Sequence, residues 1–517
     1  MKKVSFLLFL FFIITVTVNS YKEEKPDWSY GKPDKIFDSP WRIPPNQDKM
    51  PVLCLLRRGG KFIYLLPRTS DSIHSIKIFQ YFPETKALKQ IEFFDEKGNL
   101  YEEYSGNHTG EWYKIFYVDR KLFKRREGKE IFLKVMYDGE FANSPKDERD
   151  LDFVSTYLSD KPLPKLPGWL VGDLHLHSEV TSNSSEYGPP LEIFKHSNEW
   201  FELDYVILTD HSYDISKKEW LKLKKFSKEN SSDKLSIIIG QEVHAKDDDS
   251  IFPSISQCHS MHLLTYGVEK RIKTGSLLLN SYNPTKSDNE VIEEILKKGG
   301  FLYIAHPEAE KEGNWNHKAN RIKAHYFGNP IIGIEVLNEG DFRLLQNIKA
   351  MELYKDFLLK GYKFKVIGNS DSHSLRVGMG RTYVKASVNN KMEILKALRE
   401  GKTVASDGPF GYLEVINKTG KKAELGEAIE GESFEVEIFW DSNPQHQYTD
   451  IKEIKLFLGK VGSEEEKESI LDNLDKQRGY QRLKLEKLPK GSYYVRVEFF
   501  TFDEKRAVTS PIFVESN

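Results

Sequence analysis

The sequence predicts an α/β protein in which a barrel-like central domain lies between two β-sandwich domains. Short strand-like runs separated by turn residues occupy the first and last parts of the chain, whereas apolar strands alternate with amphipathic helices between them. Such alternation is typical of a parallel sheet, and its repetition favours a barrel, while closely spaced short strands favour sandwiches. The length of 517 residues is sufficient for about three domains.

Residues 1–20 have the composition of a signal peptide. Lys2 and Lys3 precede an apolar run from Val4 to Val18, and polar residues follow it. The run is shorter than the ~20 residues that a membrane span needs and suits the apolar core of a secretory signal. We therefore expect cleavage and export to the periplasm or the extracellular space, with no stable membrane span.

Residues 21–165 are expected to form the N-terminal β-sandwich. Six strand-like runs alternate with turn signals such as Arg58-Gly59-Gly60, which is the spacing of a sandwich. A proline-rich segment over 161–167 then forms a linker. The runs are Val52–Leu56, Lys61–Leu66, Ile73–Tyr81, Gln90–Phe94, Trp112–Val118 and Ile131–Tyr137.

The barrel is expected over residues 168–409. Seven apolar strands are predicted there, and helices predicted at Leu191–Glu202, Asn289–Lys298 and Leu344–Lys360 separate several of them. The strands are Trp169–Leu176, Tyr205–Thr209, Leu235–Gln241, Met261–Gly267, Phe301–Ala305, Ile331–Leu337 and Phe364–Gly368.

The second β-sandwich is expected over residues 410–517, because strand signals return after Gly408-Pro409. The charged segment Glu464–Glu468 is expected to be a solvated loop or helix face. The strands are Gly411–Ile416, Ser433–Trp440, Ile454–Leu458, Gln481–Leu485 and Tyr493–Phe500.

Composition narrows the choice of partners. A formal net charge of −2 provides no long-range attraction to nucleic acid or anionic lipid, so a small-molecule ester is the expected partner. Cys54 and Cys258 are the only cysteines, which excludes a disulfide framework and leaves open whether these two pair. The oligomeric state is equally open.

The distribution of histidines predicts a metal site. Eleven of the fourteen histidines lie between His175 and His373. Residues i and i+2 of a strand point to the same side, so His175 and His177 can face one ion. Ligand-type residues also follow four further predicted strands, whose carboxyl ends would face one barrel mouth. They are Asp210 and His211, Glu242, His306, and Asp371 and His373.

These segments resemble the motifs of a known family. In combination they are similar to the PHP (polymerase and histidinol phosphatase) superfamily over about residues 170–410, and the segments Gly380–Val384 and Ala397–Pro409 are similar to its exported, carbaryl-hydrolase-like branch. The flanking β regions carry no resemblance to a known family. The motifs are G-D-L-H-L-H-S from Gly172, L-T-D-H-S from Leu208, G-Q-E-V from Gly240, M-H-L-L from Met261, A-H-P from Ala305 and N-S-D-S-H from Asn369.

The resemblance implies a distorted (β/α)7 barrel that holds two or three divalent ions. It implies that Glu242 bridges two of them, one ion having three further ligands and the other having two. The further ligands are His175, His177 and Asp371 for the first ion, and His262 and His306 for the second.

A third ion would use His211, His373 and an acid in the loop after the H-x-H motif. The chain reads Ser185-Glu186-Tyr187-Gly188 where the superfamily commonly has S-D-G, so Glu186 is the candidate acid. The mixed nitrogen and oxygen ligands suit Zn²⁺, Mn²⁺ or Fe²⁺.

Asp210 and Arg381 are the candidate catalytic residues beside the ligands. Asp210 would accept the N–H of a ligand histidine and fix its tautomer, with direct ligation as the alternative. Arg376 and Arg381 follow the Asp371 motif and could bind an anionic substrate through bidentate contacts, with a structural salt bridge as the alternative.

Other polar residues near the motifs have two interpretations each. His244, His259 and His325 could donate a proton to a leaving group, although such residues are more often loop histidines without a catalytic role. Glu335 and Asn338 end a predicted strand and could either contact substrate or support a ligand.

The leading hypothesis is an exported hydrolase of phosphoesters in which divalent ions make hydroxide available near neutral pH. A carboxylester, carbamate or amide hydrolase on the same ions is the alternative, because such a hydroxide can also attack carbonyl carbon. A third hypothesis is a non-catalytic protein that binds glycans or surfaces and has structural metals.

Overall fold

The structure is a computed structural model that describes residues 35–517 with gaps. The predicted signal peptide, the predicted strand Lys61–Leu66, Glu186, Cys258 and His259 lie outside the described residues. The gaps are 39–41, 46, 57–71, 83–84, 86, 95–99, 102–105, 108–112, 124, 141–149, 182–187, 214, 247–259, 275–284, 309–321, 374, 444–448, 473 and 486.

The N-terminal strands form two sheets, mostly through antiparallel pairs. Buried residues alternate with less buried ones in β10, where Ile131 and Leu133 are buried, as expected for a sheet with one covered face. Val52 and Phe116 are also buried. One sheet has the order β1 (Lys35–Asp38), β3 (Lys49–Leu56), β9 (Tyr113–Asp119), β6 (Phe93–Phe94) and β7 (Leu100–Tyr101). The other has the order β2 (Arg42–Ile43), β11 (Asp150–Leu158), β10 (Lys129–Glu140), β4 (Ser72–Phe82) and β5 (Ala87–Gln90), with β8 (Gly106–Asn107) on β4.

The central region is not the predicted (β/α)7 barrel. Its strands belong to two sheets, and β12–β20, β20–β21, β15–β16 and β16–β17 are antiparallel pairs. The first sheet contains β14 (Ser236–Ile239), β13 (Tyr205–Leu208), β12 (Trp169–Leu176), β20 (Arg381–Lys385) and β21 (Thr403–Ser406). The second contains β15 (Gln241–Lys246), β16 (Ser260–Tyr266), β17 (Phe301–Ile304), β18 (Ile331–Leu337) and β19 (Lys365–Gly368).

The barrel prediction is wrong about which strands pair and in which direction they run. Apolar periodicity locates buried strands, but it does not specify their neighbours or their direction. The single residue Gly240 separates β14 from β15, so the chain changes sheets there without an intervening helix. Two parallel bridges, Leu176 with Ser372 and His211 with Glu242, nevertheless bring the ends of the two sheets together.

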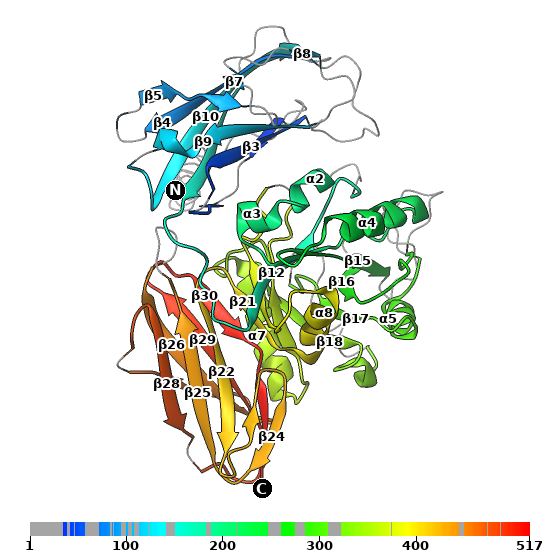
Figure 1. The fold of residues 1–517 in the computed structure, drawn as a ribbon. Coiled ribbons are helices and arrows are strands. Elements are labelled where there is room, and N and C mark those ends of the chain that lie inside the picture. The colour runs from blue at the N-terminus through cyan, green and yellow to red at the C-terminus, as the bar shows by residue number, and fades with distance from the viewer. Residues whose placement is uncertain are drawn as a thin grey trace, which may run out of the picture.

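Helices cover the central strands (Figure 1). α4 packs on β14, α5 on β15 and β17, α7 on β18, and α8 on β20. Capping boxes begin α4 at Ser216 and α5 at Ser287, which satisfies backbone N–H groups that have no partner within the helix. The α-helices are α2 (Leu191–Phe194), α3 (Ser197–Phe201), α4 (Lys217–Asn230), α5 (Asp288–Lys297), α7 (Leu345–Leu359) and α8 (Lys391–Glu400), and the 3-10 helices are η1 (Arg120–Phe123) and η3 (Ala324–Tyr326).

The C-terminal region continues the first central sheet. β21 pairs with β30, so an 11-stranded sheet crosses residue 410. Its C-terminal strands are β24 (Ala428–Gly431), β26 (Ile451–Lys460), β27 (Glu466–Ile470), β29 (Gly491–Thr501), β30 (Arg506–Thr509) and β31 (Ile512–Ser516). A separate sheet has the order β23 (Lys422–Ala423), β22 (Phe410–Asn417), β25 (Phe434–Asp441) and β28 (Arg478–Lys484).

The charged segment Glu464–Glu468 is only partly the predicted loop or helix face. Residues 466–468 belong to β27, an end strand of the 11-stranded sheet that pairs with β26. Residues 467–470 of β27 are exposed, and charged side chains on such a strand discourage pairing with another chain.

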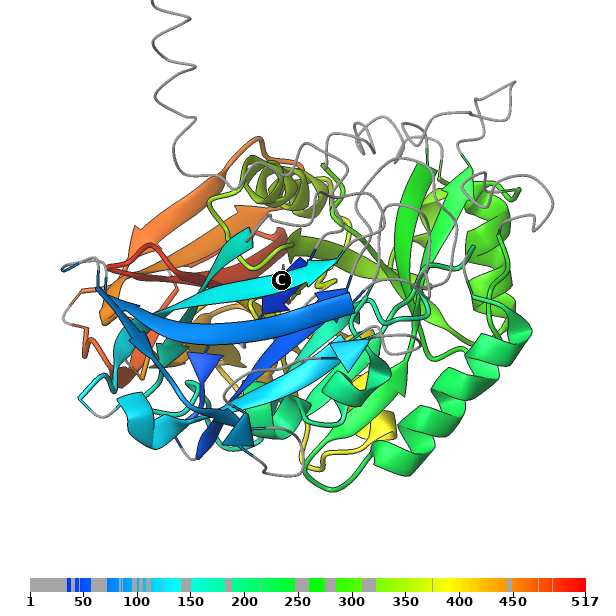
Figure 2. The ribbon, with the colours of Figure 1, turned by 90° about the horizontal axis from the view of Figure 1, so that it is seen from above.

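One apolar core joins the central and C-terminal regions. The Trp169 ring lies 5.1 Å from the rings of both Phe410 and Tyr412. The N-terminal sheets contact the central region through Tyr117, whose ring lies 6.2 Å from that of Trp200, and through an ion pair between Arg42 and Glu202. Figure 2 shows the N-terminal strands lying over the central region.

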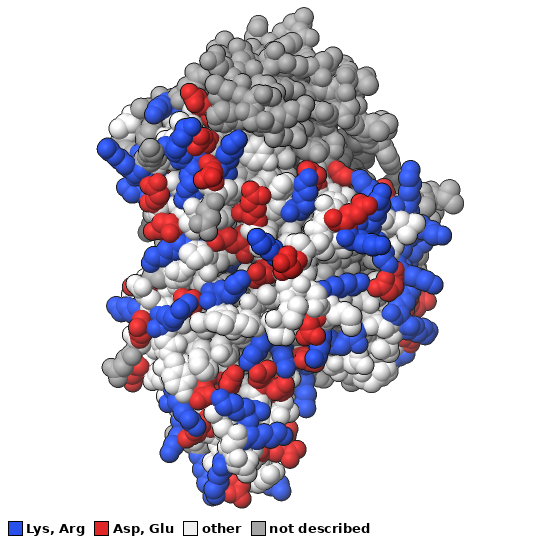
Figure 3. All heavy atoms as spheres, in the orientation of Figure 1, with Lys and Arg blue, Asp and Glu red and all other residues white. Residues whose placement is uncertain are grey.

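The described surface carries mixed charge. Lys and Arg side chains alternate with Asp and Glu side chains over the face seen in Figure 3. Among the described residues, no helix is both long and apolar enough to cross a membrane.

Candidate metal site

Eight of the nine predicted ligands lie together where the ends of the two central sheets meet. Among the described residues, five groups of three side chains each bring one ligand-type atom per residue within 4.8 Å of the others. The groups are His177, His211 and His373; His175, His306 and Asp371; His175, His177 and Glu242; His211, Glu242 and His244; and Glu242, His262 and His306. These buried clusters could hold metal ions.

Glu242 lies at the centre, with one carboxylate oxygen toward each side of the cluster. Its Oε2 lies 3.2 Å from Nε2 of His211, 3.3 Å from Nε2 of His177 and 3.6 Å from Nε2 of His175. Its Oε1 lies 2.6 Å from Nδ1 of His262 and 3.2 Å from Nε2 of His306. Each oxygen therefore has its own set of imidazoles.

Asp371 supplies a second carboxylate on the side of His175 and His177. Its Oδ1 lies 3.2 Å from Nε2 of His175 and 3.1 Å from Nε2 of His177. Asn338 donates a 3.2 Å hydrogen bond to Oδ2. The Asp371 backbone has a positive φ of 50°, which is uncommon for a residue other than glycine and often marks a functional position.

The orientation of His175 is set by Glu335, a buried carboxylate at the end of β18. Nδ1 of His175 lies 3.2 Å from Oε1 of Glu335. A carboxylate accepts, so Nδ1 carries the proton and Nε2 faces the cluster. Glu335 also accepts from the backbone N–H of His306 at 2.9 Å and from the Asn369 amide at 2.7 Å.

Asp210 acts on His177 through Thr181, whereas the sequence predicts that Asp210 accepts directly from a ligand histidine. The Thr181 hydroxyl donates to Asp210 at 2.8 Å, and Nδ1 of His177 lies 3.3 Å from that hydroxyl. Because the hydroxyl has one proton, it must accept from His177. Asp210 also accepts from the backbone and side chain of Ser178, so it also holds the segment that follows His177.

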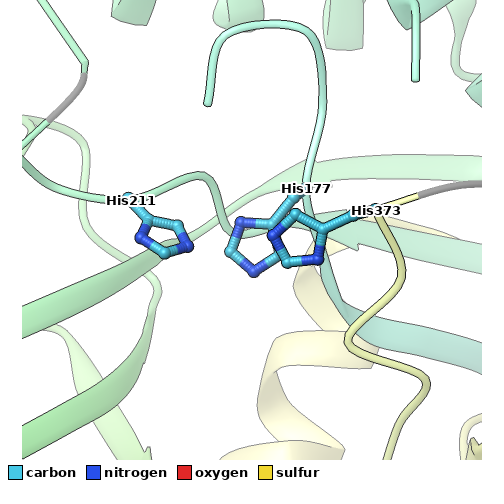
Figure 4. A group of neighbouring side chains, drawn as sticks. All are labelled: His177, His211 and His373. Atoms are coloured by element: carbon cyan, nitrogen blue, oxygen red, sulfur yellow. The ribbon is translucent and has the colours of Figure 1, made fainter. Parts of the chain in front are cut away.

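A third imidazole is oriented by the backbone. Nδ1 of His373 lies 3.1 Å from the carbonyl oxygen of Asp371, which can only accept, so the proton is again on Nδ1. Figure 4 shows that His177, His211 and His373 come from different segments and face one another. The His177 ring lies 4.1 Å from the His373 ring and 4.4 Å from the His211 ring.

These contacts fit metal ions. Nε2 of His175 and of His177 lies against carboxylate oxygens, a contact that is favourable only with a proton or a metal ion between the two atoms. Ligand atoms bound at about 2.1 Å to a tetrahedral ion lie roughly 3.4 Å apart. The separations of 3.1–3.6 Å from Nε2 of His175 and His177 to Glu242 and Asp371 match that spacing.

The protonation states of the cluster also suit ligation. Burial alone would raise the pKa of Glu242, but His211, His262 and His175 hold it well below its ordinary value. Burial lowers the pKa of His211 well below its ordinary value and that of His373 to about 3. Burial opposes charge on His175 as well, yet Asp371, Glu335 and Glu242 raise its pKa. An ionised Glu242 and neutral His211 and His373 are in the donor state that a divalent ion requires, whereas the raised pKa of His175 means that an ion bound there would displace its proton.

Two residues of this cluster were not assigned to it from the sequence. The sequence favours a loop histidine over a proton donor at His244, yet His244 lies with His211 and Glu242. The signal was present, because Glu242 and His244 stand at i and i+2 like His175 and His177, but the predicted strand ended at Gln241. The sequence leaves open whether Glu335 contacts substrate or supports a ligand. In the structure it contacts Nδ1 of His175 and accepts from the backbone of His306, and both histidines are predicted ligands.

The remaining candidates lie in different surroundings. Arg376 is exposed, whereas Arg381 is completely buried at the first position of β20. His325 is exposed in η3. The roles of Arg376 and Arg381 in substrate binding stay predictions.

Comparison with known proteins gives no family. No protein-family profile and no curated protein matches the chain. The chain is similar to the chicken CNTN1 FN1-FN3 domains at 9% identity and a TM-score of 0.15, over 93% of this chain and 99% of that one. It is similar to trypsin-activated alpha-2-macroglobulin from Escherichia coli at 8% identity and a TM-score of 0.15, over 94% of this chain and 24% of that one. It is similar to the Bacteroides uniformis beta-glucuronidase at 9% identity and a TM-score of 0.16, over 93% of this chain and 60% of that one. The chain thus spans less than two thirds of the last two, and likenesses this slight carry no argument.

Proposed function

We propose that the protein is a metal-dependent hydrolase that uses two or three divalent ions and acts on phosphoesters. The observation that carries the proposal is Glu242, whose two oxygens face separate sets of histidines. A carboxylate between two such sets is suited to bridge two ions, and sites with two ions are typical of phosphatases and nucleases. The motif resemblance to the PHP superfamily favours the same reaction.

The side chains divide the work of such a site. Bound divalent ions would act as a Lewis acid on the substrate and activate water for attack. Glu335 and Thr181 orient His175 and His177, while Asn338 holds Asp371. Orientation of this kind sets the position of each ligand atom before an ion arrives, which raises affinity. Zn²⁺, Mn²⁺ and Fe²⁺ are the ions that the donors suit.

Hydrolysis assays test the proposal. Purified protein loaded with Mn²⁺ or Zn²⁺ is expected to release p-nitrophenol from p-nitrophenyl phosphate or bis-p-nitrophenyl phosphate. A folded variant carrying His175→Ala and His177→Ala should have lost that activity, and His325→Ala is the matched control. Turnover of p-nitrophenyl acetate alone would favour the carbonyl-ester alternative. Bound metal without turnover of any of the three would contradict the choice of phosphoesters and leave the binding-protein alternative.

A further inference from the structure

Six histidines form a closed ring around Glu242. Each ring centroid lies 3.6–5.5 Å from the next one around the circle. Five of the six belong to the predicted ligand set, and His244 is the sixth. The order is His175, His177, His211, His244, His262, His306 and back to His175.

The register of β15 places His244 in this ring. Glu242 and His244 point to the same side of the strand because they are two residues apart. His244 pairs with His262 across the antiparallel β15–β16 ladder, and their rings lie 3.6 Å apart. His244 is therefore held between His211, at 4.9 Å, and His262.

His244 also has an unsatisfied ring nitrogen. His244 is 6% exposed, and its Nε2 has no hydrogen-bond partner among the described residues. A buried polar atom without a partner destabilises the folded protein. A histidine that only filled space in the core would be expected to have its ring nitrogens satisfied.

We propose that His244 is a metal ligand that forms a coordination site with His211 and Glu242, in addition to the ligands predicted from the sequence. The three offer ligand atoms within 4.8 Å of one another. The inference rests on the proposed metal centre and specifies its extent. Two nitrogens and one oxygen suit Zn²⁺ or Fe²⁺ better than Mg²⁺ or Ca²⁺. This site requires no residue from the segment that contains Glu186.

Metal binding by full-length variants tests the assignment. Metal-free protein is titrated with Co²⁺ and with Zn²⁺, and the bound equivalents are measured by mass spectrometry of the metal together with the visible absorption of Co²⁺. His244→Ala should lose one equivalent of metal or bind one ion more than about 100-fold more weakly. The reason is that altering a residue that only supports a ligand already lowers metal affinity about 10–100-fold. His325→Ala, an exposed histidine, should behave as the wild type does.

Two further variants separate the possible failures. His244→Phe keeps a ring of similar size and replaces the alanine variant if circular dichroism shows that the latter has not folded. His262→Ala reports on a ligand that the sequence predicted. If His262→Ala loses metal and the folded His244 variants keep wild-type stoichiometry and affinity, the assignment of His244 is wrong while the proposed centre stands. If the wild type binds no ion, both are wrong.

Discussion

At the scale of single residues, the site depends on hydrogen bonds that fix which ring nitrogen faces the cluster. His175, His177 and His373 each place Nδ1 against an acceptor, namely Glu335, the Thr181 hydroxyl and the Asp371 carbonyl. A neutral imidazole has one donor and one acceptor, so this choice leaves Nε2 as the lone pair on the inner side. The acceptors thus determine how these imidazoles are oriented toward the cluster.

Replacing Glu335 by glutamine should weaken metal binding without removing a ligand. Glu335 accepts hydrogen bonds from His175, the His306 backbone and two amides. The NH₂ group of a glutamine can only donate, so it could not accept from these groups. We expect the metal affinity of Glu335→Gln to fall about 10–100-fold, as measured by competition with a chelator. Glu339→Gln, at an exposed glutamate nearby, is the control. Equal affinity in the two variants would show that Glu335 does not orient His175.

At the scale of elements, strand β19 positions Asp371 and begins with a buried cation. Lys365 is 8% exposed, and its Nζ lies 5.9 Å from the centre of the Phe513 ring. Burial, with a smaller contribution from Lys363, lowers the pKa of Lys365 from 10.5 to about 8. Below pH 8 the ammonium is charged in both the folded and the unfolded chain, and the folded chain bears its desolvation cost.

Lys365→Met should therefore stabilise the protein at pH 7, by at most roughly 3 kcal/mol. Between pH 8 and 10.5 the unfolded chain binds more protons at this lysine than the folded chain. The free energy of unfolding of the wild type therefore rises with pH at this residue. The advantage of Lys365→Met should shrink over that window. Urea unfolding of both proteins at pH 7, 9 and 10 measures it, with the exposed Lys349→Met as control. A difference that does not change with pH would contradict a charged Lys365 in the folded protein.

The strands themselves were largely predictable, whereas their partners were not. β12 and β18 have the bounds that apolar periodicity predicts, because most of their residues are apolar and buried. β15 was missed since its residues Gln241, Glu242 and His244 are polar although all three are buried. Their burial depends on the cluster that they form, which no local pattern contains.

At the scale of the whole molecule, sheet membership crosses the boundaries that composition suggests. β21 and β30, which pair in the structure, lie about a hundred residues apart in sequence, on either side of residue 410. A change from helix-alternating to strand-only patterns marks that position in the sequence, but a sheet can continue through it by long-range pairing. The predicted division into domains therefore remains a prediction.

Eight of the nine predicted ligands lie together although the architecture around them differs from the predicted barrel. Strand ends that carry histidine or acid residues meet in both a barrel and the observed pair of sheets, since the bridges from Leu176 to Ser372 and from His211 to Glu242 join the sheet ends. The ligand prediction thus depended on strand ends, and it was independent of the number and direction of the strands. Support from Glu335 and Thr181 could not be predicted because it depends on hydrogen bonds between distant segments.

The metal content of the reconstituted full-length protein tests the central claim most directly. After incubation with Zn²⁺ or Mn²⁺ and removal of loosely bound ions, we expect at least two ions per chain in the wild type. A folded Glu242→Gln variant should retain fewer, because Glu242 faces the histidines on both sides. A wild type that retains less than one ion per chain, or a Glu242→Gln variant that retains the full wild-type number, would contradict the account.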